Sequence, residues 1–285
     1  MDLEEYYLPG CERNIIENQS QHITEELMRV SSRWNVIELG AGDGSKTLHF
    51  LQKLAGYGVE ISYVALDISD HVLRINGENM SRALPDMPFT AVPGNYYRTY
   101  HRLSRQEHNL ILFMGSNIGN YTEGQAVKFL HWLSAEMSSR DRALVAFDLK
   151  KHPRTILRAY DDAQGITRAF NLNILERINR ELEGNFAVHR FDHYPYYEPI
   201  SGMAYSYLVS LEDQTAVVAN TAFRFGRHEL IHTEISKKYS LAEIDRIART
   251  GGLSTLRHYI DIKSYYALSL LECHDYVSGN SYDRG

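Results

Sequence analysis

The residues most suited to chemistry in this chain form a glycine-rich loop between two apolar runs. Gly40, Gly42 and Gly44 permit positive φ and leave no side chain between the backbone and a ligand. The second apolar run, residues 61–67, ends on Asp67, and an acidic residue about 20 to 30 positions after such a loop can take both ribose hydroxyls. The pattern therefore indicates a pocket for a cofactor that carries adenosine. An ordinary tight turn followed by a surface aspartate is the alternative.

The spacing of the glycines favours S-adenosylmethionine over a nicotinamide dinucleotide. Dinucleotide loops have the spacing G-x-G-x-x-G and place a pyrophosphate on a helix N-terminus. Here the spacing is G-x-G-x-G, with Glu38 just before the first glycine, which resembles motif I of class I S-adenosylmethionine-dependent methyltransferases. Glu38 ends an apolar strand, where a buried carboxylate needs partners, so we expect it to contact the cofactor together with the loop.

The elements that must position this loop alternate between strands and helices. We expect strands at 35–40, 62–67, 89–94, 109–115 and 142–149, and helices at 12–29, 45–55, 69–81 and 122–138. Ser45 is a candidate cap for the helix that follows the loop. The alternation is typical of βαβ units and predicts an α/β fold, a class I methyltransferase Rossmann-like sheet with parallel strands.

The pattern changes after residue 150. Residues 151–184 are expected to be helical, followed by strands at 187–194, 203–212 and 222–234 whose alternation predicts an antiparallel sheet, and then by a helix at 241–249 and a final strand at 264–271 in the main sheet. We expect residues 1–150 and 237–285 to form the S-adenosylmethionine-binding domain, and residues 151–236 to form an inserted α+β substrate-binding lid. Ligands of open sheets bind beyond the strand C-termini, where a lid excludes water. Five tyrosines of this segment either wall the substrate or pack within the sheet: Tyr194, Tyr196, Tyr197, Tyr205 and Tyr207.

Composition restricts the partners of the chain. Its 285 residues are 44% hydrophobic, and its formal net charge of −6 argues against nucleic acid as a partner. The two cysteines, Cys11 and Cys273, form no C-x-x-C motif, which suits a reducing compartment. No apolar run approaches the roughly 20 residues of a membrane span, and the first residues do not resemble a signal peptide. We expect a cytoplasmic protein, a monomer or homodimer, that binds a small molecule and neither nucleic acid nor a membrane.

Further segments resemble the histidine-specific methyltransferase family. They are Glu5–Glu12, Phe113–Asn120, Arg158–Asp162, Ala169–Asn173, Ile178–Leu182 and Thr233–Tyr239. The resemblance covers nearly the whole chain in one order, so it is more specific than the glycine loop alone. Enzymes of this family methylate the α-amino group of histidine in ergothioneine biosynthesis, and fungal relatives act on tryptophan derivatives.

The resemblance implies roles for individual residues. The cofactor would contact Glu38, Gly40, Gly42, Lys46, Asp67, Asn95, Tyr96 and Gly115. The substrate would contact Tyr6, Asn120, Tyr160, Ser206, Glu234 and Ser236. Tyr6, Asn120 and Tyr160 would hold the amino and carboxylate groups of an amino acid, and Glu234 would recognise a cationic or donor side chain. Asn120, Tyr160 and Glu234 are the candidate catalytic residues.

Each of the candidate catalytic residues also has a purely structural interpretation. Asn120 follows a glycine, as in a common turn pair. Tyr160 lies beside two aspartates, as at a helix N-terminus. Glu234 in an apolar strand needs a partner, which an imidazole or guanidinium ligand would supply. The structural alternative for Glu234 is an ion pair with Lys237, Lys238 or Arg224.

Three features depart from the family pattern. Family members usually carry a further segment with a Tyr-Asp-Gly motif, whereas this chain starts almost at the Glu-Tyr-Tyr segment. Asn95 stands where an aspartate that binds adenine is expected, and it accepts a hydrogen bond without a charge. Ser206 aligns with a methionine that contacts the imidazole of histidine. Two of the departures bear on the substrate, so the acceptor stays open between histidine and another amino acid.

The expected reaction needs no metal and no covalent intermediate, because methyl transfer from a sulfonium is an in-line displacement. The enzyme contributes alignment, which saves about 7 to 11 kcal/mol of barrier, and the acceptor nitrogen must present a free lone pair. We expect an N-methyltransferase of a free amino acid, with the α-amino nitrogen of L-histidine as the leading acceptor. The alternatives are the guanidino group of L-arginine, a tryptophan derivative, or an inactive methyltransferase-like binding protein.

Overall fold

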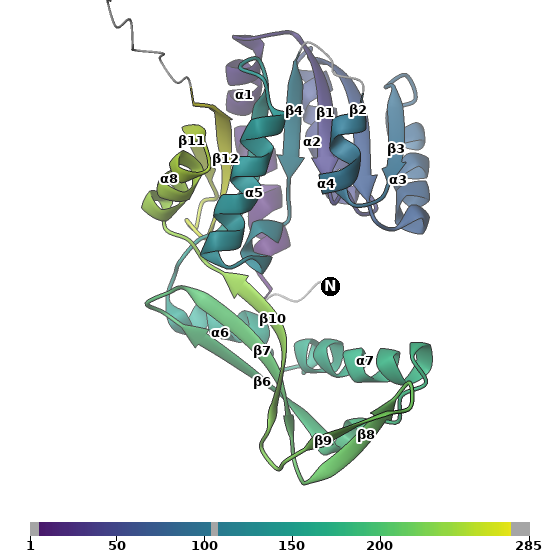
Figure 1. Cartoon of the computed structure of the whole chain (residues 1–285). Helices are drawn as coiled ribbons and strands as arrows, with labels where there is room; N and C mark the ends of the chain where they lie inside the picture. The colour runs from purple at the N-terminus through teal and green to yellow at the C-terminus, as the bar shows by residue number, and fades with distance from the viewer. Residues whose placement is uncertain (1–5, 104–107, 275–285) are drawn as a thin grey trace, which may run out of the picture.

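The computed structural model describes residues 6–103 and 108–274, and its main body is a seven-stranded sheet (Figure 1). The strands are β1 (Arg33–Leu39), β2 (Glu60–Asp67), β3 (Phe89–Pro93), β4 (Asn109–Phe113), β5 (Arg142–Asp148), β11 (Leu253–Ile260) and β12 (Tyr266–Cys273). Their order across the sheet is β11-β12-β5-β4-β1-β2-β3, with β1 to β5 parallel. This arrangement confirms the expected class I methyltransferase fold.

The predicted open sheet of parallel strands is confirmed for β1 to β5, and the expected final strand is β12, but the edge strand β11 was not predicted. β12 runs antiparallel to both β5 and β11. The Asp261 carboxylate accepts hydrogen bonds from the backbone N–H groups of Lys263, Tyr265 and Tyr266. It thereby closes a tight turn between β11 and β12, and two strands joined by such a turn must pair antiparallel.

Helices cover both faces of the sheet, and alternate side chains of each strand enter two different cores. On one face α1 (Leu8–Met28), α2 (Ser45–Gly56) and α3 (Asp70–Ala83) pack on one core, and on the other α4 (Tyr96–Thr99), α5 (Glu123–Glu136) and α8 (Leu241–Thr250) pack on the second. Val36 and Leu110 belong to the first core, whereas Ile37 and Ile111 belong to the second. Strands buried on both faces explain the continuous apolar runs in the sequence.

The loop after β1 begins its helix differently from the prediction. The residue that caps α2 is Gly44, with φ of 71°, and Ser45 is the first residue of the helix. Ser45 instead donates from its backbone N and its hydroxyl to Asp43 Oδ1, at 3.0 and 2.8 Å. A Cβ at Gly44 would lie 2.5 Å from Asn76 Oδ1, so both the conformation and the space require glycine here.

The inserted segment lies beyond the carboxyl ends of the parallel strands (Figure 1). It consists of α6 (Pro153–Tyr160), α7 (Ile166–Glu181), η3 (Val188–Arg190), β6 (Phe191–Glu198), β7 (Met203–Ser210), β8 (Gln214–Val218), β9 (Thr221–Phe225) and β10 (Leu230–Lys237). The predicted antiparallel sheet is confirmed in the order β10-β7-β6, and β8 with β9 forms a separate hairpin. The strand expected at 222–234 is divided between β9 and β10, because residues 226–229 turn the chain back.

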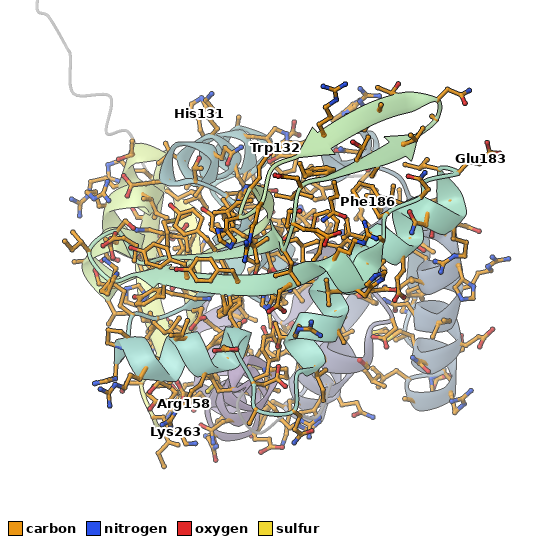
Figure 2. All side chains as sticks on the ribbon, turned by 90° about the horizontal axis from the view of Figure 1, so that it is seen from below. His131, Trp132, Arg158, Glu183, Phe186 and Lys263 are labelled. Carbon is orange, nitrogen blue, oxygen red and sulfur yellow. The ribbon has the colours of Figure 1, made fainter. Side chains whose placement is uncertain are left out.

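The two faces of this three-stranded sheet have different environments. The inner face carries Tyr197, Ala204 and Leu208 against the apolar sides of α6 and α7. Figure 2 shows both helices along that side of the sheet, with Arg158 on α6. The opposite, outer face is more open to solvent, since Tyr194 and Tyr196 on it are exposed. No helix in the described ranges has both the length and the apolar character needed to cross a membrane.

Candidate functional site

A cavity of about 220 Å³ opens at the carboxyl ends of β1 and β4. Five of the predicted cofactor residues line it, namely Glu38, Gly40, Gly42, Lys46 and Gly115. A larger hollow of about 620 Å³ lies at the opposite, amino ends of β1 and β2. Parallel sheets of this kind bind ligands at their carboxyl ends, so the smaller cavity is the candidate cofactor site.

Glu38 is buried at the bottom of this cavity with partners from the protein itself. Its carboxylate accepts hydrogen bonds from Thr47 Oγ1 at 2.7 Å and from the Tyr63 hydroxyl at 2.5 Å. Burial raises the pKa of Glu38 to about 7, although both hydroxyl groups act in the opposite direction. The burial of Glu38 therefore needs no ligand to explain it, and its contact with the cofactor stays a prediction.

Asp67 connects the glycine loop to the end of β2. Its Oδ2 accepts from the Gly42 backbone N and its Oδ1 from the Ser69 backbone N, each at 3.0 Å. A carboxylate has about four lone-pair positions, so each oxygen can accept one more hydrogen bond. The half-buried Asp67 does not line the 220 Å³ cavity, but it is hydrogen-bonded to Gly42, which does. Its contact with the ribose hydroxyls stays a prediction.

Asn95 and Tyr96 lie just past β3, the neighbour of β2. Asn95 is exposed and caps α4, since its Oδ1 accepts from the Tyr97 backbone N at 2.9 Å. The Tyr96 hydroxyl lies 2.6 Å from that of Tyr121, and the Tyr96 ring packs against Phe113, which makes it part of the second core. Neither residue lines the 220 Å³ cavity, so their contact with adenine remains a prediction.

Four side chains that the sequence did not connect form a buried cluster where the inserted segment meets β5. Asp148, the last residue of β5, lies 2.7 Å from the ammonium of Lys238, and both are fully buried. Lys151 donates to the same carboxylate and, at 2.8 Å, to the Tyr7 hydroxyl. Burial alone would lower the pKa of Lys238, but Asp148 raises it above its usual range. Lys238 is therefore held as an ammonium ion.

One signal in the sequence could have found this cluster. Asp148 ends an apolar strand in the same way as Asp67, so both lie at the carboxyl edge of the sheet. The two lysines carried no comparable signal, because surface lysines are common and their burial depends on the fold.

Tyr160 and Ser236 are brought together by Lys238. Its ammonium donates to the Tyr160 hydroxyl at 2.7 Å and to Ser236 Oγ at 2.8 Å. Tyr160 is the last residue of α6. The interpretation of this segment as a helix N-terminus holds for its neighbour Asp162, which accepts from the backbone N–H groups of Ile166 and Thr167 at the start of α7. Burial raises the pKa of Tyr160, while the ammonium of Lys238 opposes that rise.

Tyr6 lies close to this cluster. Burial raises the pKa of its hydroxyl well above the usual range, and the neighbouring Tyr160 and Glu234 raise it further. Tyr6 packs against the apolar cluster that α6 forms with β6 and β7. Glu5, with which the motif begins in the sequence, lies outside the described residues.

A β-bulge at Thr233 sets the direction of Glu234. His232 pairs with Tyr207 and Glu234 pairs with Ser206, which leaves Thr233 as the extra residue of β10. Its hydroxyl donates to the backbone oxygen of Ser206 at 3.0 Å. Because paired residues share a face, Glu234 points to the inner face with Ser206; a regular strand would send it to the outer face.

Glu234 and Ser206 both lack a partner. No ion pair or hydrogen bond joins the Glu234 side chain to any residue in 6–103 or 108–274, so the ion pairs proposed as its structural alternative are absent from this range. Burial raises its pKa, and the ammonium of Lys238 opposes the rise. The fully buried Ser206 Oγ is also unpaired. Two unpaired polar groups on one face indicate a polar ligand between them.

Asn120 completes the ring of predicted substrate residues. It ends η2 (Asn117–Asn120), which packs against β10 so closely that a Cβ at Gly119 would lie 3.4 Å from Ser236 Oγ. Asn120 is exposed, and the described part of the structure gives its amide no partner. The structure thus brings Tyr160 and Ser236 together at Lys238 and packs η2, which ends at Asn120, against β10. That Tyr6, Asn120, Tyr160, Glu234 and Ser236 form one substrate site stays a prediction.

The tyrosines of the inserted segment divide between the two faces. Tyr197 lies on the inner face, against α6. Tyr194, Tyr196, Tyr205 and Tyr207 lie on the outer face, where the rings of Tyr196 and Tyr205 stack with centroids 6.2 Å apart. These four therefore cannot wall the space at Glu234, and their packing within the sheet is the correct interpretation.

Comparison with known proteins decides the family. The model of the family described as "Histidine-specific methyltransferase, SAM-dependent" matches residues 1–273. The chain belongs to this family. The match confirms the resemblance inferred from the sequence and the enzyme class, a methyltransferase that depends on S-adenosylmethionine.

The relatives of this protein within the family include enzymes that are named for different substrates. A histidine N-alpha-methyltransferase of Mycobacterium tuberculosis (strain CDC 1551 / Oshkosh) is 30% identical over 94% of this chain and 83% of its own length. The histidine N-alpha-methyltransferase of Mycolicibacterium smegmatis (strain ATCC 700084 / mc(2)155) is 28% identical over the same shares. An L-tryptophan methyltransferase of Psilocybe serbica is 26% identical over 95% of this chain and 82% of its own.

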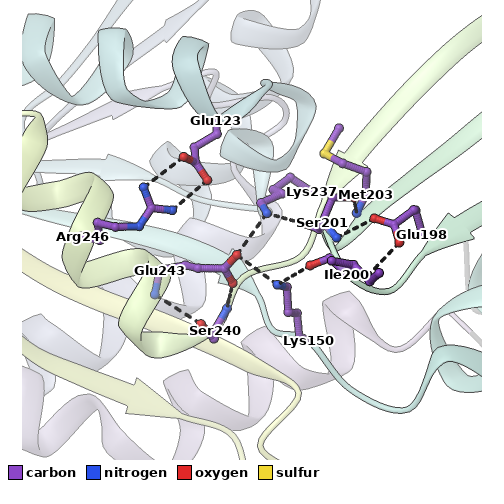
Figure 3. A network of polar contacts seen from close by, with 10 residues as sticks. All are labelled: Glu123, Lys150, Glu198, Ile200, Ser201, Met203, Lys237, Ser240, Glu243 and Arg246. Atoms are coloured by element: carbon purple, nitrogen blue, oxygen red, sulfur yellow. Dashed lines mark hydrogen bonds and ion pairs between the residues drawn. The ribbon is translucent and has the colours of Figure 1, made fainter.

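A second polar network joins the inserted segment to α8 (Figure 3). The Glu243 carboxylate accepts from Lys150 Nζ at 3.0 Å and from Lys237 Nζ at 3.2 Å. It also accepts from the Ser240 backbone N at 2.7 Å, which completes the capping box of α8. Burial would raise the pKa of Glu243, but the Ser240 backbone and the two lysines lower it to about 2.

We expect Glu243→Gln to lower the free energy of unfolding by about 2 kcal/mol at neutral pH, since it removes two ion pairs and weakens a cap. A carboxyl group with a lowered folded pKa stabilises the protein fully above the unfolded value of 4.5, and this contribution is lost as the pH falls toward 2. Denaturant unfolding at pH 6.5 and 3.5 measures the difference between variant and wild type, which should shrink at the lower pH.

Glu123→Gln is the matched control, because Glu123 pairs with Arg246 on the exposed surface of the same network. Such surface pairs contribute about 0 to 1 kcal/mol. Equal losses in the two variants, or a Glu243→Gln effect independent of pH, would contradict the assignment.

Proposed function

We propose that this protein is an S-adenosylmethionine-dependent N-methyltransferase that acts on the α-amino nitrogen of free L-histidine. The observation that carries the proposal is the inward-facing, unpaired Glu234 beside Ser206 and Ser236. A carboxylate without a partner in a half-buried pocket suits a side chain with N–H donors, as the imidazole of histidine has. The similarity to two bacterial proteins named histidine N-alpha-methyltransferase, which extends over 94% of this chain, supports the same acceptor.

The residues present fit the cofactor at the carboxyl edge of the sheet. The 220 Å³ cavity is large enough for the amino-acid tail, with Gly40, Gly42 and Lys46 around it. Asp67 would hold the ribose hydroxyls, and Asn95 would accept from the adenine amino group. When bound, S-adenosylmethionine supplies an electrophilic methyl group on a sulfonium. Residues 1–150 and 237–285 would form this cofactor site, and residues 151–236 the lid that covers the substrate.

The side chains of the proposed substrate site have complementary tasks. Asn120, exposed at the end of η2, would orient the amino group so that its lone pair faces the cofactor side. Tyr6 and Tyr160 would hold the other polar group of the amino-acid backbone. Glu234 would fix the side chain through its N–H donors, with Ser236 on the same face. The α-ammonium must first lose a proton, so activity should rise with pH through that titration.

The Ser206 hydroxyl favours one alternative acceptor. Where the resemblance places a methionine against the imidazole, this chain has a buried hydroxyl without a partner. A guanidinium has more N–H donors than an imidazole and can satisfy both Ser206 and Glu234. The guanidino group of L-arginine is therefore the second candidate acceptor. A neutral indole would leave both groups unpaired, which makes a tryptophan derivative a weaker candidate.

The experiment that tests the proposal is a mass-spectrometric screen of free amino acids with the purified protein and S-adenosylmethionine. We expect a product heavier by one or more methyl groups with L-histidine, and fragmentation should place the methyl on the α-amino nitrogen. A product from arginine alone, modified on the guanidino group, would replace histidine with the second candidate. Binding of S-adenosylmethionine without any product from the amino acids would instead support an inactive binding protein.

A further inference from the structure

The ammonium of Lys238 uses all three of its N–H donors inside the protein. They go to Asp148 Oδ2 at 2.7 Å, to the Tyr160 hydroxyl at 2.7 Å and to Ser236 Oγ at 2.8 Å. The side chain of Lys238 is fully buried. Lys238 therefore has no donor left for a ligand, and any effect on a substrate must pass through the two hydroxyl groups.

The geometry fixes what those two hydroxyl groups can do. A hydroxyl oxygen that accepts from an ammonium must turn its own proton away from that ammonium. Ser236 also hydrogen-bonds to the Tyr160 oxygen. With Ser236 as the donor of that bond, the Tyr160 hydroxyl is available as a donor on the side away from Lys238. The positive charge beside the two hydroxyl groups also favours an anionic ligand group and repels a cationic one.

The charge of Lys238 is only partly neutralised. Asp148 is shared between Lys238, Lys151 and the Tyr7 hydroxyl, and the second nearby carboxylate, Glu234, acts on Lys238 from a distance without an ion pair. A free amino acid offers one anionic end, its carboxylate, and one cationic end, its ammonium. Of these, only the carboxylate accepts hydrogen bonds and attracts the remaining positive charge.

We propose that Lys238 is a positioning residue that makes Tyr160 and Ser236 hydrogen-bond donors and so directs the carboxylate of the substrate to Tyr160. This inference rests on the proposed function, since it requires a free amino acid as the substrate. The amino group then lies on the side of Asn120, toward the cofactor. The nearby positive charge additionally favours the neutral form of the amine, which is the form with a lone pair.

The test compares an amino acid with its decarboxylated form. Calorimetry in the presence of S-adenosylhomocysteine gives the dissociation constants of L-histidine and histamine, and of L-arginine and agmatine, for wild type and for Lys238→Met. We expect the preference of wild type for the amino acid over its amine to fall about tenfold to a hundredfold in the variant, the amount expected for a lost charge-assisted hydrogen bond. The affinity for the amine itself should change little.

Matched variants separate positioning from folding. Lys237→Met removes a buried lysine one residue away, whose ammonium contacts Glu243 on the other side of β10 (Figure 3), and should leave the preference unchanged. Tyr160→Phe removes only the hydroxyl and should reproduce the loss if Lys238→Met does not fold. In Lys238→Met itself, Asp148 keeps Lys151 and Tyr7 as partners, which favours folding.

The possible outcomes distinguish this inference from the proposed function. Wild type that binds neither amino acid would overturn the proposed function, and this inference with it. The positioning role alone would be overturned if wild type binds one of the amino acids and Lys238→Met keeps the same preference for the amino acid over its amine. Where Lys238→Met does not fold, an unchanged preference in Tyr160→Phe has the same meaning. Equal loss of affinity for the acid and the amine would show that Lys238 only supports the structure.

Discussion

Replacing Asp67 with alanine is expected to lower the affinity for S-adenosylmethionine at least about a hundredfold, because each hydrogen bond to a charged group contributes about 1.5 to 3 kcal/mol. The ribose would lose two such bonds. The glycine loop would also lose a fixed point, since Asp67 accepts from the Gly42 backbone N at 3.0 Å. Titration calorimetry with S-adenosylmethionine and with S-adenosylhomocysteine measures the change directly.

Two further variants separate the charge of Asp67 from its hydrogen bonds to the backbone. Asp67→Asn keeps one oxygen acceptor, enough for one of the two backbone N–H groups of Gly42 and Ser69, while it removes the charge, so most of the loss should persist. Asp70→Ala is the control, because Asp70 is an exposed aspartate three residues on that contacts only Arg74 among the described residues. Unchanged affinity in Asp67→Ala, with an unchanged melting temperature, would remove the ribose assignment.

Glu234→Gln is expected to lower kcat/KM for L-histidine by about 100-fold, mainly through a higher KM. The pocket would keep its shape but lose the charge that pairs with an N–H donor, and an interaction present in both the ground state and the transition state acts on KM. Steady-state kinetics with histidine, at saturating S-adenosylmethionine, gives both constants.

The control for this variant lies in the same segment. Glu212→Gln changes an exposed glutamate whose only ion pair in the described chain is with Arg190, at 2.8 Å. Its kinetics should match wild type. If Glu234→Gln also matched wild type, Glu234 would not recognise the acceptor. If Glu234→Gln gained activity toward amino acids with neutral side chains, that gain would also support the role of Glu234 in recognising the acceptor.

The parts of the fold that depend on local patterns could be predicted from the sequence. The apolar runs at β1, β4 and β5 and the glycine loop identified the sheet and its cofactor edge. Helix starts were equally clear where a side chain caps the helix, as Ser69 does for α3 and Thr122 for α5. These features depend on residues within a few positions of one another, so one sequence contains the necessary information.

The parts that depend on contacts between distant residues could not be predicted. Asp148, Lys151 and Lys238 come from a strand end, a loop and a second strand end, and only the folded chain brings their charges together. The direction of Glu234 was equally hidden, because the bulge at Thr233 interrupts the alternation that a strand pattern assumes. The role of Glu234 was proposed from the family resemblance, not from its position in the strand.

The bulge at Thr233 also means that the length of β10 encodes the chemistry of the pocket. One residue more or fewer between the bulge and the end of the sheet would turn every side chain in that part of β10 to the opposite face. Ile235 and Lys237 would then replace Glu234 and Ser236 on the inner face. In the evolution of this family, a single inserted or deleted codon could therefore turn an acidic pocket into an apolar and basic one. Gaps in an alignment of this strand should be compared with acceptor preference as carefully as substitutions.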